Sequence, residues 1–156
     1  MFDKLKQLNR LTKTYNAGLL QGKAYRILEF HLSQTLSPYN LSIPEWKLLG
    51  QLVDQDKLKI GEIADLLDVD PPLVTVLVQM LQSKKMVDRR VDENDRRVNF
   101  ILPTFKGRDH INALEKDVSR LLKQLLSGIS SNELYDYMKV LRMLSKNGSL
   151  KRVKKL

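Results

Sequence analysis

The chain has 156 residues and a formal net charge of +9, from 27 Lys and Arg against 18 Asp and Glu. This length is typical of one domain with a sizeable core, and the surplus of positive charge favours a polyanionic partner, either nucleic acid or a membrane surface. The absence of cysteine excludes disulfides, thiolate zinc sites, iron–sulfur clusters and thiol redox sensing. With only two histidines available, we expect no metal and no other cofactor.

The location of the protein is suggested by its hydropathy. The first ten residues carry a charge every few positions and lack an apolar stretch, so we expect no signal peptide. No run of about 18 uncharged apolar residues occurs, which is the length that a membrane-spanning helix requires. Few residues are Gly (7) or Pro (5), which favours helices over an all-β fold. We expect a mainly helical, cytoplasmic protein without a membrane partner.

The first forty residues predict two amphipathic helices or one interrupted helix. Apolar side chains recur three or four residues apart over 3–17, and the pattern resumes over 24–32 after two glycines. A Ser-Pro-Tyr-Asn stretch at 37–40 then ends it.

Capping signals set the next helices. Ser42 and Glu45 have the spacing of a capping box, so a helix begins near residue 43 and ends around 54–56. A short helix follows at about 61–67. The residues of the first of these helices that we expect to point inward are Trp46, Leu49, Leu52 and Val53.

A third helix is expected over about 71–84. Asp70 before Pro71 is typical of an N-cap and first turn. The apolar residues that follow at i, i+3, i+4 and i+7 form the expected core face, namely Val74, Leu77, Val78 and Leu81.

The remaining elements are one hairpin and two helices. The runs MVDRR and VNFIL, separated by charged residues, predict a β-hairpin with a charged tip. A long helix is expected over 104–127, capped by Gly128. Ser130 and Glu133 form a second capping box, which begins a last helix that should end at 147–148.

A helix, a short helix, an Asp-capped helix and a hairpin follow one another in the order of a winged helix-turn-helix. From about Leu41 to Leu114 the chain resembles the multiple-antibiotic-resistance regulator (MarR) family of bacterial transcription factors, through IGEIADLLDVDPPLVTVLVQMLQSKKMVDRR, DENDRRVNFIL and TFKG. Counting the flanking helices, the resemblance covers nearly the whole chain.

The resemblance implies a mainly α protein of the α+β winged-helix type. We expect a single domain over 1–156, with a winged helix-turn-helix that has a two-stranded β wing at 42–103. Dimerisation helices would flank it at 1–40 and 104–147, and a basic tail would follow at 148–156. In the family such helices join two chains, which bind a pseudo-palindromic operator. An intrachain helical bundle is the alternative for these helices.

The wing motif is the most specific part of the resemblance. Asp95-Arg96-Arg97 matches the family's Asp-x-Arg motif, which implies that Arg97 enters a minor groove and that Asp95 orients it. An ordinary solvated turn is the alternative interpretation. Lys84 and Lys85, together with Arg89 and Arg90, are expected to add phosphate contacts, although the alternation of the strand lets only one of the two arginines point toward DNA. At Lys85 the chain departs from a glycine common in the family, at a cost of roughly 1 kcal/mol if the backbone there is left-handed.

The expected recognition helix is unusually apolar. Its outward residues include Pro72, Leu73, Thr75, Val76 and Gln79. Family members usually carry more polar or basic side chains at the positions of Pro72, Leu73 and Val76. This face either contacts thymine methyl groups, with polar support from Thr75 and Gln79, or binds a protein. The N-terminus of the helix is also expected to bind phosphate.

Many family members release DNA when a small aromatic or anionic ligand binds. The resemblance places Tyr25, His31, Tyr39 and Trp46 near such a cleft, although aromatic residues and histidines on apolar faces are more often core.

We expect a homodimeric regulator that binds double-stranded DNA, acts as a repressor and performs no catalysis. A protein-interaction module on a winged-helix scaffold, with nonspecific nucleic-acid binding, is the alternative. An enzyme ranks third because no phosphate loop, catalytic triad or metal-ligand cluster occurs in the sequence.

Overall fold

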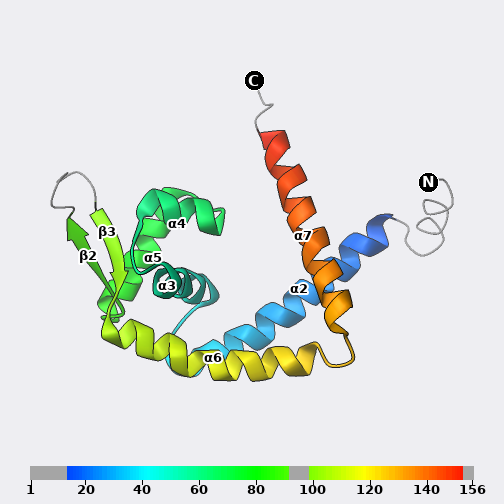
Figure 1. The fold of residues 1–156 in the computed structure, drawn as a ribbon, viewed down its shortest axis with the longest axis horizontal. Coiled ribbons are helices and arrows are strands. Elements are labelled where there is room, and N and C mark those ends of the chain that lie inside the picture. Colours follow the sequence, from blue (N-terminus) through cyan, green and yellow to red (C-terminus); the bar gives the residue numbers. More distant parts are fainter. Residues whose placement is uncertain (1–13, 92–98, 153–156) are drawn as a thin grey trace. The chain divides into compact units, whose positions relative to one another are not determined.

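A computed structural model describes residues 14–91 and 99–152, and the side chains of 18–91 and 99–147 (Figure 1). The chain divides into two compact units, with the boundary between Leu121 and Leu122. The helices and strands follow in the order α2 (Thr14–Leu36), the 3-10 turn η1 (Ser37–Tyr39), α3 (Ile43–Gln55), β1 (Leu58–Lys59), α4 (Ile60–Leu67), α5 (Pro71–Ser83), β2 (Val87–Val91), β3 (Asn99–Pro103), α6 (Phe105–Leu125) and α7 (Ser131–Arg152).

Helix α2 runs without a break through both of its glycines. A helical glycine costs only about 1 kcal/mol relative to alanine, which the rest of a 23-residue helix can offset. Of the two expectations for this segment, the described residues therefore contain one uninterrupted helix. The helical pattern predicted over 3–13 lies outside the described residues.

The capping box that begins α3 is confirmed. The Glu45 amide donates to Ser42 Oγ at 3.4 Å, and the Ser42 amide donates to Glu45 Oε2 at 2.9 Å. The helix ends at Gln55, within the predicted range, and Asp56 follows with a positive φ of 64°. On α6, Arg108 donates to Asp56 Oδ1 at 2.7 Å, which ties the end of α3 to that helix.

The inward face of α3 was only partly predicted. Leu49 and Leu52 are fully buried as expected, but Trp46 and Val53 are only half-buried. The buried positions beside them belong to Leu48 and to the charged residue Glu45. A buried carboxylate departs from the simple apolar pattern and depends on a partner from another helix, described below.

Helix α5 matches its prediction closely. Its bounds agree, and every residue of the predicted core face is at most 5% exposed, namely Val74, Leu77, Val78 and Leu81. Asp70 occupies the N-cap position as expected, although its side chain makes no capping hydrogen bond. The helix packs against α3 and α4.

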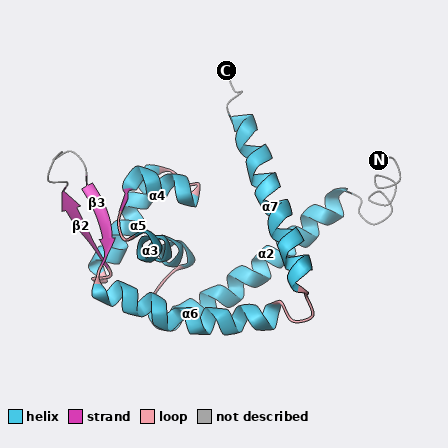
Figure 2. Ribbon diagram, in the orientation of Figure 1, coloured by secondary structure: helices cyan, strands magenta, loops and turns pink. Residues whose placement is uncertain are grey.

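The hairpin is confirmed, but the sheet has three strands in the order β1-β3-β2 rather than two (Figure 2). The additional strand, β1, pairs Leu58 with Ile101 and Lys59 with Phe100. Two residues are too few to show a strand periodicity. The sheet places Leu58, Val87 and Ile101 in the core with the leucines of α3 and α5.

The turn between α5 and β2 is packed tightly against the start of α6. Thr104 Oγ1 accepts from the Gly107 amide at 3.1 Å and donates to the Lys85 carbonyl at 2.8 Å. A Cβ on Gly107 would lie 2.2 Å from the carbonyl oxygen of Met86, so only glycine fits there.

At the other end of α6, Gly128 has the left-handed φ of 83° expected of a cap. The second capping box is also confirmed, because Glu133 Oε2 accepts from the Ser130 amide at 2.8 Å. These hydrogen bonds from Ser130 lower the pKa of Glu133. Helix α7 continues to Arg152, so the predicted end at 147–148 was wrong. One glycine followed by good helix formers does not end a helix.

Within residues 14–91 and 99–152, no helix combines the length and the hydropathy that a membrane crossing needs.

Candidate nucleic-acid interface

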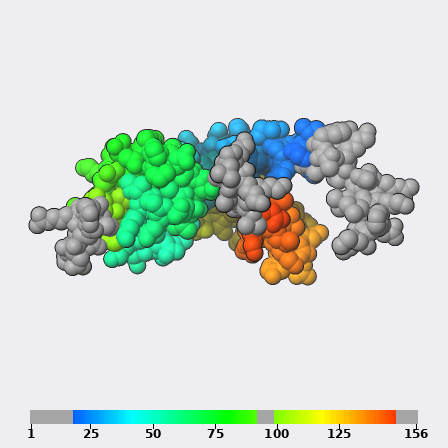
Figure 3. Space-filling view, turned by 90° about the horizontal axis from the view of Figure 1, so that it is seen from above, coloured from blue at the N-terminus to red at the C-terminus, as the bar shows by residue number. Residues whose placement is uncertain are grey.

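The outer face of α5 is exposed and mostly apolar. Leu73, Val76 and Met80 are 46%, 49% and 41% exposed, and they lie at i, i+3 and i+7 along one side of the helix. Pro72, Gln79 and Ser83 are exposed as well. In the view from above, green atoms of the α5 segment lie at the surface (Figure 3). The structure therefore exposes Pro72, Leu73, Val76 and Gln79 as expected.

The hydroxyl groups of this helix are already engaged. Thr75, which is half-buried, donates from Oγ1 to the Pro71 carbonyl at 3.1 Å. Ser83 Oγ donates to the Met80 carbonyl at 2.7 Å. Among the described residues, the Gln79 amide makes no such bond, which makes it the polar side chain on this face that can bind another molecule.

The N-terminus of α5 is a weaker phosphate site than the sequence suggested. Helix N-termini bind phosphate through their free backbone amides, but Pro71 and Pro72 have no N–H group. The Leu73 amide donates to the Asp70 carbonyl at 3.0 Å. Phosphate binding at this end loses its main donors.

Two arginines of β2 lie on opposite faces of the sheet. Residues directly opposite each other in an antiparallel pair share a face, and Arg89 lies opposite buried Ile101 whereas Arg90 lies opposite Phe100. Both arginines are exposed. As the alternation of the strand predicted, they point to different sides.

A cluster of positive charge accompanies Arg90. The ammonium nitrogens of Lys57 and Lys59 lie 4.7 Å and 5.4 Å from the centroid of the Phe100 ring, within the range of cation–π attraction. In the described part of the chain, Arg90, Lys57 and Lys59 therefore make one face of the sheet basic around Phe100. The wing motif, Asp95, Arg96 and Arg97, lies outside the described residues, so its groove contact stays a prediction.

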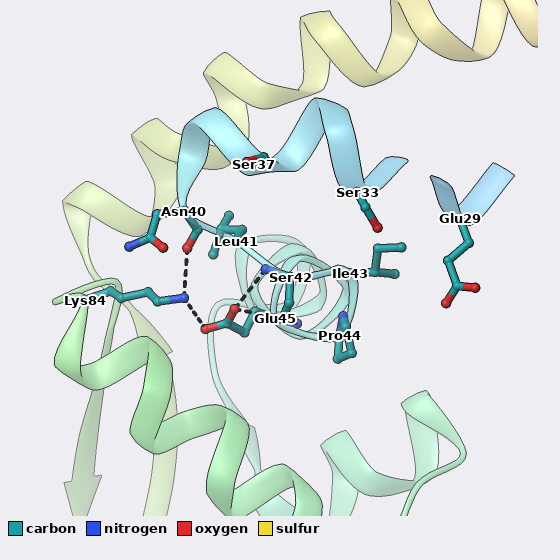
Figure 4. A pocket seen from close by; sticks show the side chains of 10 residues that line it. All are labelled: Glu29, Ser33, Ser37, Asn40, Leu41, Ser42, Ile43, Pro44, Glu45 and Lys84. Atoms are coloured by element: carbon teal, nitrogen blue, oxygen red, sulfur yellow. Dashed lines mark hydrogen bonds and ion pairs between the residues drawn. The ribbon is translucent and has the colours of Figure 1, made fainter. Parts of the chain in front are cut away.

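Lys84 has a different role from the expected one. Its Nζ donates to Glu45 Oε1 at 2.5 Å and to the Asn40 carbonyl at 2.8 Å (Figure 4). The Glu45 and Lys84 side chains are 1% and 18% exposed, so this is a largely buried ion pair. An ammonium held in this way is not free for phosphate. Sequence reasoning used Glu45 only as a capping residue and missed its ion pair.

The ionisation of Glu45 reflects this environment. Burial alone would raise the pKa of the carboxyl, but hydrogen bonds from Lys84 and Ser42 outweigh burial and hold the pKa below its usual value. The ion pair thereby joins the start of α3 to the end of α5.

Lys85 adopts a left-handed conformation, with φ of 61°, so the condition for strain at this position is met. Two hydrogen bonds hold the turn around Lys85. Thr104 Oγ1 donates to the Lys85 carbonyl, and Lys106 Nζ donates to the Lys84 carbonyl at 2.8 Å. These contacts offset the strain of a lysine at this position.

The four residues predicted to bind a ligand have separate surroundings. Tyr25 and His31 are exposed on α2, where the Tyr25 hydroxyl donates to Glu29 at 3.3 Å. Trp46 is half-buried on α3. The Tyr39 hydroxyl donates to Asp117 Oδ2 at 2.7 Å, and this hydrogen bond is the main reason that the pKa of Tyr39 is raised.

A pocket of about 530 Å³ lies beside the Glu45–Lys84 ion pair (Figure 4). None of the four predicted ligand residues lines it. The lining residues come from the end of α2, the start of α3 and the end of α5, and they are Glu29, Ser33, Ser37, Asn40, Leu41, Ser42, Ile43, Pro44, Glu45 and Lys84. Within the described ranges, no group of three or more His, Asp or Glu side chains could hold a metal ion.

The order α3, α4, α5 and a hairpin, with the outer face of α5 exposed, defines a winged helix-turn-helix protein. Residues 41–98 match the sequence model of the MarR family. The chain is 29% identical over 101 residues to the uncharacterised HTH-type transcriptional regulator YdgJ of Bacillus subtilis. That match covers 65% of this chain and 62% of YdgJ, which is less than two thirds of that relative. The similarity to the MarR family therefore rests on the winged-helix segment of the chain, residues 41–98.

Two solved structures share the fold of this chain. A mutant MarR of E. coli complexed with operator DNA has a TM-score of 0.74 at 21% identity, over 92% of this chain and 97% of that chain. CouR from Rhodococcus jostii RHA1, bound to p-coumaroyl-CoA, has a TM-score of 0.78 at 20% identity, over 86% of this chain and 94% of that chain.

Proposed function

We propose that the protein is a sequence-specific, DNA-binding transcription regulator that acts as a homodimeric repressor on pseudo-palindromic promoter DNA. The observation that carries the proposal is the exposed outer face of α5, which occurs together with basic residues around Phe100 of the hairpin. Both features lie in the segment that is similar to the MarR family. In this arrangement α5 enters the major groove and the wing follows the backbone into the adjacent minor groove. The similar E. coli MarR fold, complexed with operator DNA, supports this docking. The protein would act in the cytoplasm, where promoter DNA lies.

Apolar residues on the terminal helices support the homodimer. On α2, Leu19, Leu20, Tyr25 and Phe30 are all well exposed. On α7 the exposed apolar residues are Tyr135, Tyr137, Met138, Val140, Met143 and Leu144. A soluble monomer rarely leaves this much apolar surface in water, and a second copy of the chain would cover it. Two recognition helices related by a two-fold axis then match two half-sites one DNA turn apart.

We further propose that a small aromatic or anionic ligand releases the DNA. CouR, which shares the fold, was solved with p-coumaroyl-CoA. In this chain the pocket beside Glu45 and Lys84 includes the residue that follows α5, so a bound molecule would contact the end of the recognition helix. Tyr25, His31, Tyr39 and Trp46 remain candidates for contacts outside that pocket.

One observation favours a second candidate function. On α4, Leu66 is 51% exposed, and with Leu73, Val76 and Met80 it gives α4 and α5 more exposed apolar surface than a DNA-binding face usually has. A protein partner could bind these residues while the basic groups bind nucleic acid nonspecifically.

Selection from a library of random DNA duplexes distinguishes the two functions. A regulator enriches a two-fold symmetric sequence, and sedimentation of the selected complex gives two protomers per site. An interaction module enriches no sequence, because its nucleic-acid binding depends on phosphate charge alone. Recovery of no consensus after repeated rounds would refute the proposed function.

A further inference from the structure

The recognition face presents carbon where most DNA readers present nitrogen and oxygen. Leu73, Val76 and Met80 form one exposed apolar stripe along α5. Thr75 and Ser83, which the sequence left available for hydrogen bonding to bases, use their hydroxyls on carbonyls of their own helix. Gln79 remains as the single polar side chain of this face with an unoccupied amide among the described residues.

The chemistry of the major groove restricts what such a face can read. G·C pairs present only hydrogen-bonding groups there, whereas thymine adds a C5-methyl group. Apolar side chains pressed against guanine O6 and N7 or the cytosine amine would strip water from these groups without replacing its hydrogen bonds. When the same side chains pack against a thymine methyl group, the apolar surfaces of both the side chain and the methyl group are buried.

The amide of Gln79 complements this pattern. A glutamine side chain can bond N6 and N7 of adenine with both of its groups at once. Gln79 follows Val76 by three residues and precedes Met80, so it lies on the same side of α5 as the stripe. An adenine next to thymines is therefore the base that suits its position.

We infer that α5 recognises A·T-rich half-sites by packing Leu73, Val76 and Met80 against thymine methyl groups, with Gln79 bonded to an adenine. This inference rests on the proposed function and names the sequence class it selects. Seven residues separate Leu73 from Met80, or about 10 Å of helix, which spans about three base-pair steps of 3.4 Å. Each half-site therefore contains a run of about four A·T pairs, which three steps connect.

DNA rather than a protein suits this stripe because of what surrounds it. The chain carries a net charge of +9, and Lys57, Lys59 and Arg90 lie around Phe100 on one face of the sheet in the same winged helix. A polyanion with an apolar strip along its groove matches both features. An uncharged apolar protein surface would match only the stripe.

Replacing thymidine by deoxyuridine removes the C5-methyl group and preserves base pairing. In the selected duplex, each replacement of a thymidine that faces Leu73, Val76 or Met80 within the four-pair run should weaken binding about fourfold, from the loss of one buried methyl group. The same replacement outside the runs should have no effect. The slope of affinity against salt should not change, because no phosphate contact is altered.

Variants of exposed residues assign the effect to α5. The double variant Leu73→Ala and Val76→Ala should lose the deoxyuridine penalty at the thymines that these two side chains face and keep it at the thymine that faces Met80. Leu66→Ala, an exposed leucine of α4, is the matched control and should keep the fourfold penalty. Gln79→Ala should relax the preference for adenine at one position of the run.

The outcomes separate the inference from the proposed function. Specific binding that tolerates deoxyuridine throughout the run, or a selected consensus rich in G·C pairs, overturns the inference and leaves the regulator intact. Failure to enrich any consensus overturns both and favours the protein-binding alternative for this face.

Discussion

The Glu45–Lys84 ion pair gives the sharpest stability prediction. Lys84→Met keeps the length of the side chain but removes the ammonium that donates to Glu45 at 2.5 Å and to the Asn40 carbonyl at 2.8 Å. The Glu45 carboxylate, 1% exposed, then keeps only its hydrogen bonds from Ser42.

The expected loss follows from burial. Removing one partner of a fully buried ion pair costs about 3–5 kcal/mol, because the remaining charge is left without compensation. Lys84 is 18% exposed, so water already weakens the pair somewhat. We expect a loss of about 2–3 kcal/mol at pH 7, or roughly 4–12 °C in melting temperature for a chain of this size.

The loss should depend on pH in a defined direction. In the wild type the pKa of Glu45 lies below its unfolded value. This carboxylate therefore contributes stability above roughly pH 4.3, and the contribution is lost as the pH falls through the folded pKa. In Lys84→Met the pKa of Glu45 rises, so the carboxylate is protonated at a higher pH than in the wild type. Protonation removes the unpaired buried charge that destabilises the variant. The difference in stability between the two proteins should shrink as the pH falls toward 4.

Urea unfolding followed by circular dichroism at pH 7 and pH 4 measures this difference. Protein concentration is held constant because dimerisation contributes to stability. Lys47→Met, at an exposed lysine of α3, is the control and should lie within about 0.5 kcal/mol of the wild type. A Lys84→Met loss equal to that control, or one that does not change with pH, would refute the assignment of a buried ion pair.

Three further substitutions test other parts of the structure. Gly107→Ala should lose about 3 kcal/mol in urea unfolding, because its Cβ would meet the Met86 carbonyl oxygen at 2.2 Å, whereas Gly50→Ala, with open space around it, should be neutral or slightly stabilising. Lys85→Gly should raise the free energy of unfolding by about 1 kcal/mol, since φ is 61° there; an unchanged or lower value would mean that the turn relaxes the strain. Arg97→Ala should weaken DNA binding by roughly 1–3 kcal/mol in an anisotropy titration, and wild-type affinity would remove the wing from the account.

The sequence predicted those elements that depend on residues close to one another along the chain. The core face of α5 and both capping boxes depend on residues three to seven positions apart, so periodicity and spacing were sufficient. The predicted end of α7 was wrong, because an Asn-Gly pair is a turn signal that a long helix can override. The winged-helix order and the hairpin followed from the succession of these local elements.

What the sequence did not predict depends on distant partners. Strand β1 exists because two residues pair with β3, more than forty positions along the chain. Glu45 is buried because Lys84, 39 residues away, neutralises it, and no local pattern marks either residue as a partner. Because no local pattern links Lys84 to Glu45, the sequence analysis predicted a phosphate contact for Lys84 instead. The exposed residues of α5 were predicted well, because the complement of a helical core face is its outer face.

The central claim is that α5 and the hairpin form a surface that reads DNA sequence. Fluorescence anisotropy with the selected duplex and a scrambled duplex, each at two salt concentrations, tests it most directly. If α5 and the hairpin read sequence, the protein binds the selected duplex about a thousandfold or more tightly than the scrambled duplex, and this ratio of affinities persists at the higher salt. Equal affinities for the two duplexes, falling steeply together as salt rises, would show attraction to phosphate alone and contradict the claim.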